Sequence, residues 1–303
     1  MLSPTVRRPQ RGACVAGWSG TRRGVPESPR APLRNSQCVN TMIDVQDLVK
    51  NFGSFCAVDH ISFAVPEGQI FAFLGPNGAG KTTTIKMLTT VLHPTSGTLR
   101  VDGHDPQREQ RLVRRSFGIV FQDPSLDNEL TALENMELHG VLYGVPSVER
   151  RQRIESLLRF VELWERRGDY VKTYSGGMRR RLEVARALLH KPKILFLDEP
   201  TLGLDPQTRN HIWTFIQNLS KEEEVTVFFT THHMEEAERV AEQVAVIDHG
   251  KIVAQGSPTE LKESTQTKTL EDAFIQLTGH TIRDEEASST DRMRMMRRVW
   301  RGR

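Results

Sequence analysis

The sequence contains few cysteines and no long hydrophobic run. Its three cysteines, Cys14, Cys38 and Cys56, lack the spacing of a metal site, and they fit a reducing compartment without structural disulfides. No stretch approaches the roughly 18 apolar residues of a membrane helix, so we expect that the chain does not cross a bilayer by itself. The 303 residues show no internal repeat, which predicts that any functional unit occurs only once in the chain.

Acidic residues are scarce at both ends of the chain. Residues 1–41 contain seven Arg and one acidic residue, and residues 290–303 contain six Arg and one acidic residue. The rest of the chain has 28 basic and 36 acidic residues, a net charge of about −8, although the whole chain is at +3. The basic character belongs to the ends, so we expect no nucleic acid as a partner of the main body.

The two ends have few features of folded structure. Residues 1–41 are rich in Arg, Pro, Gly and Ser without an apolar period, which predicts a disordered extension. An organelle transit peptide is one alternative, and a translation start at Met42, where the regular pattern begins, is another. The Arg-rich residues 290–303 form either a solvated tail or a contact with an anionic membrane surface.

The most informative motif is a glycine-rich loop between a predicted strand, residues 70–74, and a predicted helix, residues 82–92. Such a loop directs backbone N–H groups and the helix dipole at one point, which attracts phosphate. Lys81 would reach the β- and γ-phosphates of a nucleotide, and the Thr82 hydroxyl would be a Mg²⁺ ligand. An ordinary Gly-rich turn is the alternative. The predicted phosphate site consists of Gly75, Pro76, Asn77, Gly78, Ala79, Gly80, Lys81, Thr82 and Thr83.

Further strands and helices alternate along the chain, which predicts a mostly parallel sheet with helices on both faces. Turn signals occur at Asp102-Gly103 and His249-Gly250. Residues 123–190 lose strand character, and we expect a helical insertion there. Strands are predicted at residues 43–49, 61–65, 99–101, 117–121, 194–197, 225–229, 244–247 and 252–254, and helices at 130–143, 148–163, 176–189, 206–220 and 234–242.

Two carboxylates end the apolar run of residues 194–197. Ligands of parallel sheets bind at the carboxyl ends of the strands, so Asp198 is placed to hold Mg²⁺. Glu199 is placed to accept the proton of an attacking water. A solvated acidic strand end is the other interpretation, and the phosphate loop in the same chain makes it weaker.

A second anion site is predicted at Ser175-Gly176-Gly177, just before an Arg-rich helix. Ser175 is a natural N-cap, and the two glycines leave the helix start unobstructed. One γ-phosphate does not need two complete anion-binding sites, the glycine-rich loop and this helix start, from the same chain. We therefore expect each chain to offer this helix start to the nucleotide of a second copy. A simple Ser-Gly turn before a charged helix is the alternative.

The sequence resembles the ATP-binding subunit of ABC transporters over residues 43–278. The resemblance is carried by GPNGAGKTT, by YSGGM in the place of the family signature, usually LSGGQ, and by ILFLDEP. It implies a P-loop NTPase α/β core with an antiparallel β subdomain and an inserted helical subdomain. It also implies ATP and Mg²⁺ as cofactors and ATP hydrolysis as the activity. Tyr174 and Met178 depart from the usual signature, but the Ser-Gly-Gly part is intact.

The resemblance implies roles for four more residues. Gln122 resembles the glutamine that touches Mg²⁺ and the attacking water, and it joins the helical subdomain to the core. His232 resembles the histidine that contacts the γ-phosphate, with His233 as a competitor. Asp205 resembles an aspartate at the dimer contact, and Phe52 takes the place of the aromatic residue that stacks on adenine. Three of them also have a plain structural interpretation: a polar strand end for Gln122, an imidazole at a helix start for His232 and a packed hydrophobe for Phe52.

The signature and residues 269–285 also resemble the daunorubicin-resistance branch of ABC exporters. This implies a subunit that powers export of a drug-like or lipid-like compound through a separate permease. Implied partners are a second ATP-binding subunit and that permease, at the cytoplasmic face of the membrane. We expect an ATP-binding domain at residues 42–260 and an extension at 261–303. A soluble assembly ATPase and a nucleotide sensor without turnover are the alternative functions.

Overall fold

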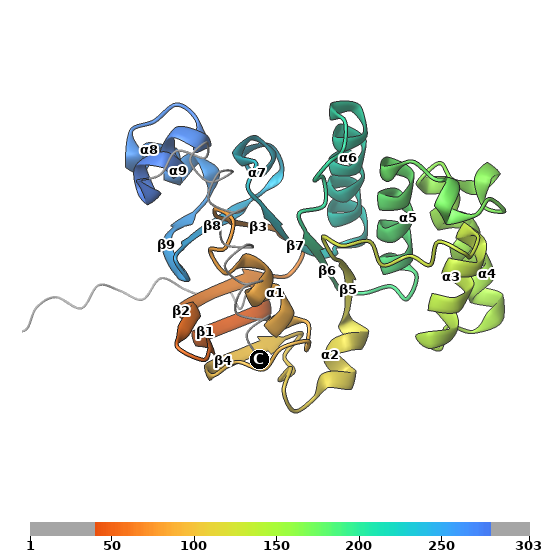
Figure 1. Ribbon diagram of the computed structural model, residues 1–303, viewed down its shortest axis with the longest axis horizontal. Coiled ribbons are helices and arrows are strands. Elements are labelled where there is room, and N and C mark those ends of the chain that lie inside the picture. Colours follow the sequence, from red (N-terminus) through yellow and green to blue (C-terminus); the bar gives the residue numbers. More distant parts are fainter. Residues whose placement is uncertain (1–39, 280–303) are drawn as a thin grey trace, which may run out of the picture. The chain divides into compact units, whose positions relative to one another are not determined.

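The computed structural model describes residues 40–279, whose elements are labelled in Figure 1. The predicted N-terminal extension, apart from its last two residues, and the Arg-rich tail at 290–303 lie outside the described residues. Within residues 40–279, no helix combines the length and the apolar character that crossing a membrane requires.

The larger sheet has six strands and is mostly parallel. Only β8 and β9 pair in the antiparallel sense. Every residue of β3, β6 and β7 is buried, which explains the apolar runs at residues 70–74, 194–197 and 227–229. The strand order is β5 (Phe117–Val120), β6 (Ile194–Asp198), β7 (Thr226–Thr231), β3 (Ile70–Leu74), β8 (Gln243–Asp248) and β9 (Lys251–Gly256).

The smaller sheet is antiparallel, in the order β2 (Phe55–Pro66), β1 (Thr41–Phe52) and β4 (Ser96–Val101). Both predicted tight turns are confirmed. Asp102 and Gly103 have φ of 51° and 75°, and His249 and Gly250 have φ of 45° and 80°. Two successive positive φ values match the right-handed twist of a hairpin.

The faces of the six-stranded sheet bury two separate cores. In β3, Phe71 and Phe73 pack with Phe228 and with Phe63 of the small sheet, at ring-centroid distances of 5.5–5.6 Å. The alternate residues of β3 face a core that contains Trp213 of α6. The strands β3, β6 and β7 are thus covered on both sides, and their carboxyl ends form a fixed edge.

The described helices lie around these sheets, and Figure 1 shows α3, α4 and α5 grouped beyond β5 and β6. These three helices enclose a core of their own, so the expected helical insertion is present. The helices are α1 (Lys81–Leu88), α2 (Gln110–Ser116), α3 (Ala132–Leu142), α4 (Ser147–Phe160), α5 (Gly176–Leu188), α6 (Pro206–Glu223), α7 (Met234–Val240), α8 (Pro258–Thr265) and α9 (Leu270–Thr278), with short 3₁₀ turns at Trp164–Arg166 and Val171–Thr173.

Several elements differ from the expectation. α1 ends at Leu88 instead of residue 92, and α4 ends at Phe160 instead of residue 163. Thr90 and Glu162 have φ of 65° and 58°, and a left-handed residue cannot continue an α-helix. The helices α2, α8 and α9 were not predicted. Phe274 of α9 is buried in the same core as Trp213, which stabilises this short helix through packing.

Candidate nucleotide site

The phosphate loop connects β3 to α1 and packs closely against neighbouring backbone. A Cβ on Gly75 would lie 2.3 Å from the Ile247 carbonyl oxygen, and one on Gly80 would lie 2.6 Å from the Ala57 carbonyl oxygen. Gly80 also has a φ of 110°. Only glycine fits these two positions. Asn77 and Gly78, at the tip of the loop, are exposed and accessible to a ligand.

Lys81 is the first residue of α1, and its ammonium group lies against the loop. The Nζ atom donates to the carbonyl oxygens of Gly75, at 2.7 Å, and Pro76, at 3.1 Å. It also lies 3.6 Å from Oε1 of Glu199. The predicted phosphate ligand and the predicted base are therefore neighbours, although 118 positions separate them in the sequence.

Asp198 and Glu199 lie at the carboxyl end of β6, as predicted, and both are buried. Oδ1 of Asp198 accepts hydrogen bonds from the hydroxyls of Thr230, at 2.6 Å, and Thr82, at 3.3 Å. Carboxylate and hydroxyl oxygens are ligands that Mg²⁺ prefers, and the ion completes its shell with water and substrate phosphates. The Thr82–Asp198 pair therefore fits a Mg²⁺ site.

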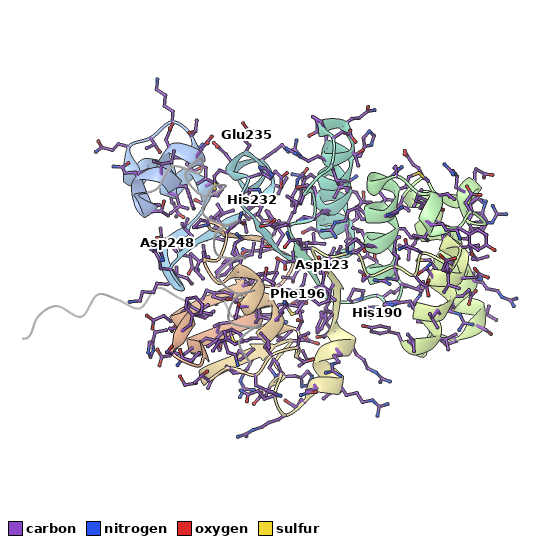
Figure 2. The ribbon with its side chains drawn as sticks, viewed as in Figure 1. Asp123, His190, Phe196, His232, Glu235 and Asp248 are labelled. Atoms are coloured by element: carbon purple, nitrogen blue, oxygen red, sulfur yellow. The ribbon has the colours of Figure 1, made fainter. Side chains whose placement is uncertain are left out.

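Two basic groups, Lys81 and His232, lie beside the Glu199 carboxylate. Nδ1 of His232 lies 3.2 Å from its Oε1, on the side of the strands next to α7 where Figure 2 labels the histidine. Burial raises the pKa of the Glu199 carboxyl, but His232 and Lys81 outweigh this effect, and the net pKa is lowered. The group is therefore a carboxylate at neutral pH, the form that can accept a proton.

The structure separates the roles of the two adjacent histidines. His232 contacts Glu199, whereas His233 forms the start of α7, where its backbone N–H donates to the Thr231 hydroxyl at 2.9 Å. This geometry favours His232 over His233 as the group beside the reacting phosphate.

Two predicted residues lie apart from this cluster. Gln122 is exposed in the segment after β5, near Asp123 in Figure 2, and within residues 40–279 it forms no hydrogen bond to Asp198, Glu199 or Thr82. Phe52 ends β1 with 48% of its surface exposed, and the Lys50 ammonium lies 5.1 Å from its ring centroid. An aromatic ring this open can stack on a base.

The signature segment is also away from Lys81. Ser175 caps α5, with its Oγ accepting from the Met178 N–H at 3.2 Å. Gly176 is exposed, and a Cβ on Gly177 would lie 2.8 Å from the Thr208 Cγ2 atom. Figure 1 shows the helices in separate regions, with α5 beyond α6 and α1 beside the small sheet. The start of α5 therefore belongs to the helical group and not to the phosphate loop of the same chain.

The start of α6 lies next to the start of α5. Asp205 caps α6, accepting from the Thr208 N–H at 3.0 Å and from the Thr208 hydroxyl at 2.6 Å. These hydrogen bonds lower the pKa of the exposed Asp205 carboxyl. Through the contact of Gly177 with Thr208, the signature and the Asp205 loop form one surface.

The two departures from the usual signature have structural reasons. Tyr174 is buried in the core of the helical group, and its hydroxyl donates to the Arg166 carbonyl oxygen at 2.7 Å. The Met178 sulfur contacts Nη1 of Arg166 at 3.9 Å. Both side chains pack within their own chain and leave Ser175 and Gly176 exposed.

Comparison with known proteins agrees with this geometry. The ABC transporter family profile matches residues 58–202. The chain is 44% identical, over 228 residues, to the daunorubicin/doxorubicin resistance ATP-binding protein DrrA of Streptomyces peucetius; the match covers 75% of this chain and 69% of DrrA. The chain belongs to the ABC transporter family of ATP-binding proteins. The linearmycin resistance ATP-binding protein LnrL of Bacillus subtilis strain 168 is another relative, 40% identical over 80% of this chain and 76% of LnrL.

Solved structures of ABC ATP-binding subunits have the same fold. One such subunit superimposes with a TM-score of 0.72 at 28% identity, covering 78% of this chain and 99% of that one. Another is a dimeric ATP-binding cassette in a post-hydrolysis state with ADP and phosphate, with a TM-score of 0.65 at 28% identity, covering 71% and 98%. The predicted P-loop NTPase fold is confirmed, and this ABC ATP-binding subunit is an ATPase.

Sequence reasoning missed some residues of the ABC site. Thr230 binds Asp198, and Glu236 accepts from the Thr201 hydroxyl at 2.6 Å, both in buried positions. Arg180, the middle residue of a run of three Arg, is buried beneath the carboxylates. A threonine ending an apolar strand was an available signal for Thr230, whereas nothing in the local sequence marked Arg180.

Proposed function

We propose that this ABC ATP-binding subunit powers the export of a drug-like or lipid-like compound through a separate membrane permease, from the cytoplasmic face of the membrane. The names of its relatives support export: daunorubicin/doxorubicin resistance, linearmycin resistance and Nod factor export. Affinity purification of the chain from solubilised membranes should recover a polytopic membrane protein. Recovery of the chain with no membrane protein would contradict this part of the proposal.

The cluster at the carboxyl edge of the sheet would bind and cleave ATP. Backbone N–H groups from Asn77 to Thr83 cradle the phosphates, and Lys81 leaves its loop carbonyls to bind the β- and γ-phosphates. Phe52 stacks on adenine. Thr82 and Asp198 would hold Mg²⁺, which would neutralise charge on the phosphates, and the segment after β5 would have to move toward them for Gln122 to reach the ion.

Glu199 is the general base in this proposal. It accepts a proton from the water that attacks the γ-phosphate, while His232 orients the carboxylate and contacts the phosphate. The observation that carries the proposal is the convergence on Glu199 of Lys81, at 3.6 Å, and His232, at 3.2 Å.

The exposed start of α5 completes the site of a second copy. Ser175, Gly176, Gly177 and Asp205 lie at the starts of α5 and α6 and not in the Lys81 loop, and the dimeric cassette among the similar structures supports pairing. Two ATP molecules would lie between two chains, and cleavage would remove the phosphate charge that joins them. The closed dimer must bind ATP more tightly than ADP for this coupling to work.

The substitution Glu199→Gln tests the proposed chemistry. The amide keeps the shape of the side chain but cannot take up the proton, so kcat for ATP hydrolysis should fall at least about a hundredfold. ATP binding, measured by equilibrium titration, should persist. Glu235→Gln is the matched control, because Glu235 is an exposed acid on α7. A Glu199→Gln protein that hydrolyses ATP at the parental rate would refute the base assignment.

A further inference from the structure

Arg180 is a buried cation beneath the end of β6. All three nitrogens of its guanidinium donate hydrogen bonds, and four of the five acceptors are backbone carbonyl oxygens. It donates to Pro200 O (2.7 Å), Phe121 O (2.6 Å), Asp198 O (3.1 Å), Glu199 O (3.0 Å) and Glu183 Oε2 (3.0 Å). Only a planar fork with five N–H donors can bind so many acceptors from one point, and Lys cannot replace it.

The neighbouring arginines of α5 point elsewhere. Arg179 donates to the Val171 carbonyl oxygen at 3.3 Å, and Arg181 donates to Val161 O and to Glu162 Oε2, both at 3.0 Å. Successive residues of a helix differ by about 100° in direction, so one residue of the run faces β6 while the others face the helical group. Arg180 alone of these three contacts the carboxylate segment.

The segment that Arg180 holds contains a strained residue. Glu199 has a φ of 48°, a left-handed conformation that costs a non-glycine residue free energy. Such a conformation persists only where surrounding contacts fix it. Arg180 binds the carbonyl oxygens of residues 198, 199 and 200, and the Glu199 N–H donates to Thr230 O at 3.1 Å. These contacts fix the direction of the Glu199 side chain.

The same cluster reaches the segment that carries Gln122. Arg180 binds Phe121 O, next to Gln122 in the chain. Glu183, buried and paired with Arg180, accepts from the Ser125 N–H at 2.8 Å, and Arg186 donates to Ser125 O at 2.7 Å. One face of α5 therefore contacts both ends of the Gln122 segment and the turn at Glu199.

We propose that Arg180 is a positioning residue for ATP hydrolysis: with Glu183, it sets the Glu199 turn and the Gln122 segment relative to the start of α5. The inference rests on the proposed function, because Glu199 is taken as the base. A movement of the α5 start, which carries Ser175, would reach both groups through this guanidinium. A merely structural ion pair would stabilise the fold without affecting the rate.

The test compares three variants of the full chain. Arg180→Lys keeps the charge but loses the fork. The double variant Arg180→Met/Glu183→Gln removes both buried charges, because loss of one partner alone leaves an unpaired buried charge and risks misfolding. The glutamine can still accept from the Ser125 N–H. Arg181→Lys is the matched control, on the same helix and also bound to a carbonyl and a carboxylate.

Three quantities are measured: kcat from phosphate release, the ATP Kd by equilibrium titration and the urea midpoint of unfolding. In the double variant kcat should fall at least about thirtyfold, since small misplacements of reacting groups cost up to about a hundredfold. Its ATP Kd should stay within about threefold of the parental value, because the phosphate loop is unchanged. Arg180→Lys should lose about tenfold or more in kcat, and Arg181→Lys should match the parent.

A double variant that folds and hydrolyses ATP at the parental kcat would overturn the proposal. If the double variant does not fold, Arg180→Lys is the deciding variant. A parental kcat in Arg180→Lys would overturn the proposal. A lowered kcat, with the ATP Kd and the urea midpoint unchanged, would support it. Glu199→Gln is assayed in parallel. Parental turnover of Glu199→Gln would refute the base assignment itself, which separates failure of the proposed function from failure of this inference.

Discussion

At the scale of single residues, the site depends on a few side chains held in place by neighbours distant in the sequence. Asp198 is bound by hydroxyls from α1 and β7, and Glu199 lies between Lys81 and His232. Lys81, Asp198 and Glu199 are buried, each beside a partner, as buried charges require. A substitution here therefore changes binding or catalysis together with a local set of contacts.

Lys81→Ala should weaken ATP binding at least about tenfold. The substitution removes a charge-assisted contact with phosphate, which contributes about 1.5–3 kcal/mol. Equilibrium titration with ATP measures the effect. Lys86→Ala, also in α1 but outside the loop, should bind ATP like the parent. Unchanged ATP affinity of Lys81→Ala would argue against the phosphate cradle.

At the scale of elements, a ring stack joins the helical group to the six-stranded sheet. Tyr143 lies 3.9 Å from His190 and 4.6 Å from His139, measured between ring centroids, and Nε2 of His190 lies 2.9 Å from the Phe117 carbonyl oxygen of β5. Burial lowers the pKa of His139 to about 3 and that of His190 to about 4. Both rings are therefore neutral in the folded chain well below pH 6.

This stack predicts a loss of stability in mild acid. As pH falls below about 6.5, the unfolded chain takes up protons on these histidines and the folded chain does not, so the free energy of unfolding falls until the folded pKa values are reached. Between pH 7 and pH 5, the free energy of unfolding should fall in both proteins, and the fall should be about 1–2 kcal/mol smaller in His139→Phe than in the parent, as measured by urea unfolding. His93→Phe, at an exposed position, should behave like the parent. An unaltered pH dependence in His139→Phe would contradict this account.

At the scale of the whole molecule, the parts of the proposed nucleotide site come from different regions of the same chain. The phosphate loop follows the carboxyl end of β3, inside the six-stranded sheet, and the Ser175 helix start lies with the helical group. A second copy can bring the two together, which makes the dimer the unit of ATP hydrolysis in the proposed function.

Gly176→Ala tests this arrangement. Gly176 has no neighbour within 4 Å of an added Cβ, so the free energy of unfolding should change by no more than about 0.5 kcal/mol. The ATPase rate should nevertheless fall at least about tenfold, because the methyl group would meet the nucleotide of the partner copy. Gly168→Ala, also without neighbours, should change neither quantity. A full ATPase rate in stable Gly176→Ala would contradict the two-copy site.

Much of the fold could be predicted because its signals are local. A run such as residues 194–197 must be a buried strand, and Asp102-Gly103 adopts the positive φ values of a tight turn with little cost. The short helix α2 has no side-chain N-cap and gave no such signal, whereas Thr269, which caps α9, was a local signal that was overlooked. Phe274 stabilises α9 only because it reaches a core formed by distant strands.

The sequence by itself determined which chemical groups end each strand and begin each helix: the glycine loop before Lys81, the carboxylates after β6 and the Ser175 cap of α5. These follow from spacing along a few residues. Only the tertiary structure decided that His232 rather than His233 contacts Glu199, that Thr230 shares Asp198 with Thr82, and that Arg180 is buried. The physical reason is that a buried polar group is stable only beside its partners, and here those partners come from segments far apart in the chain.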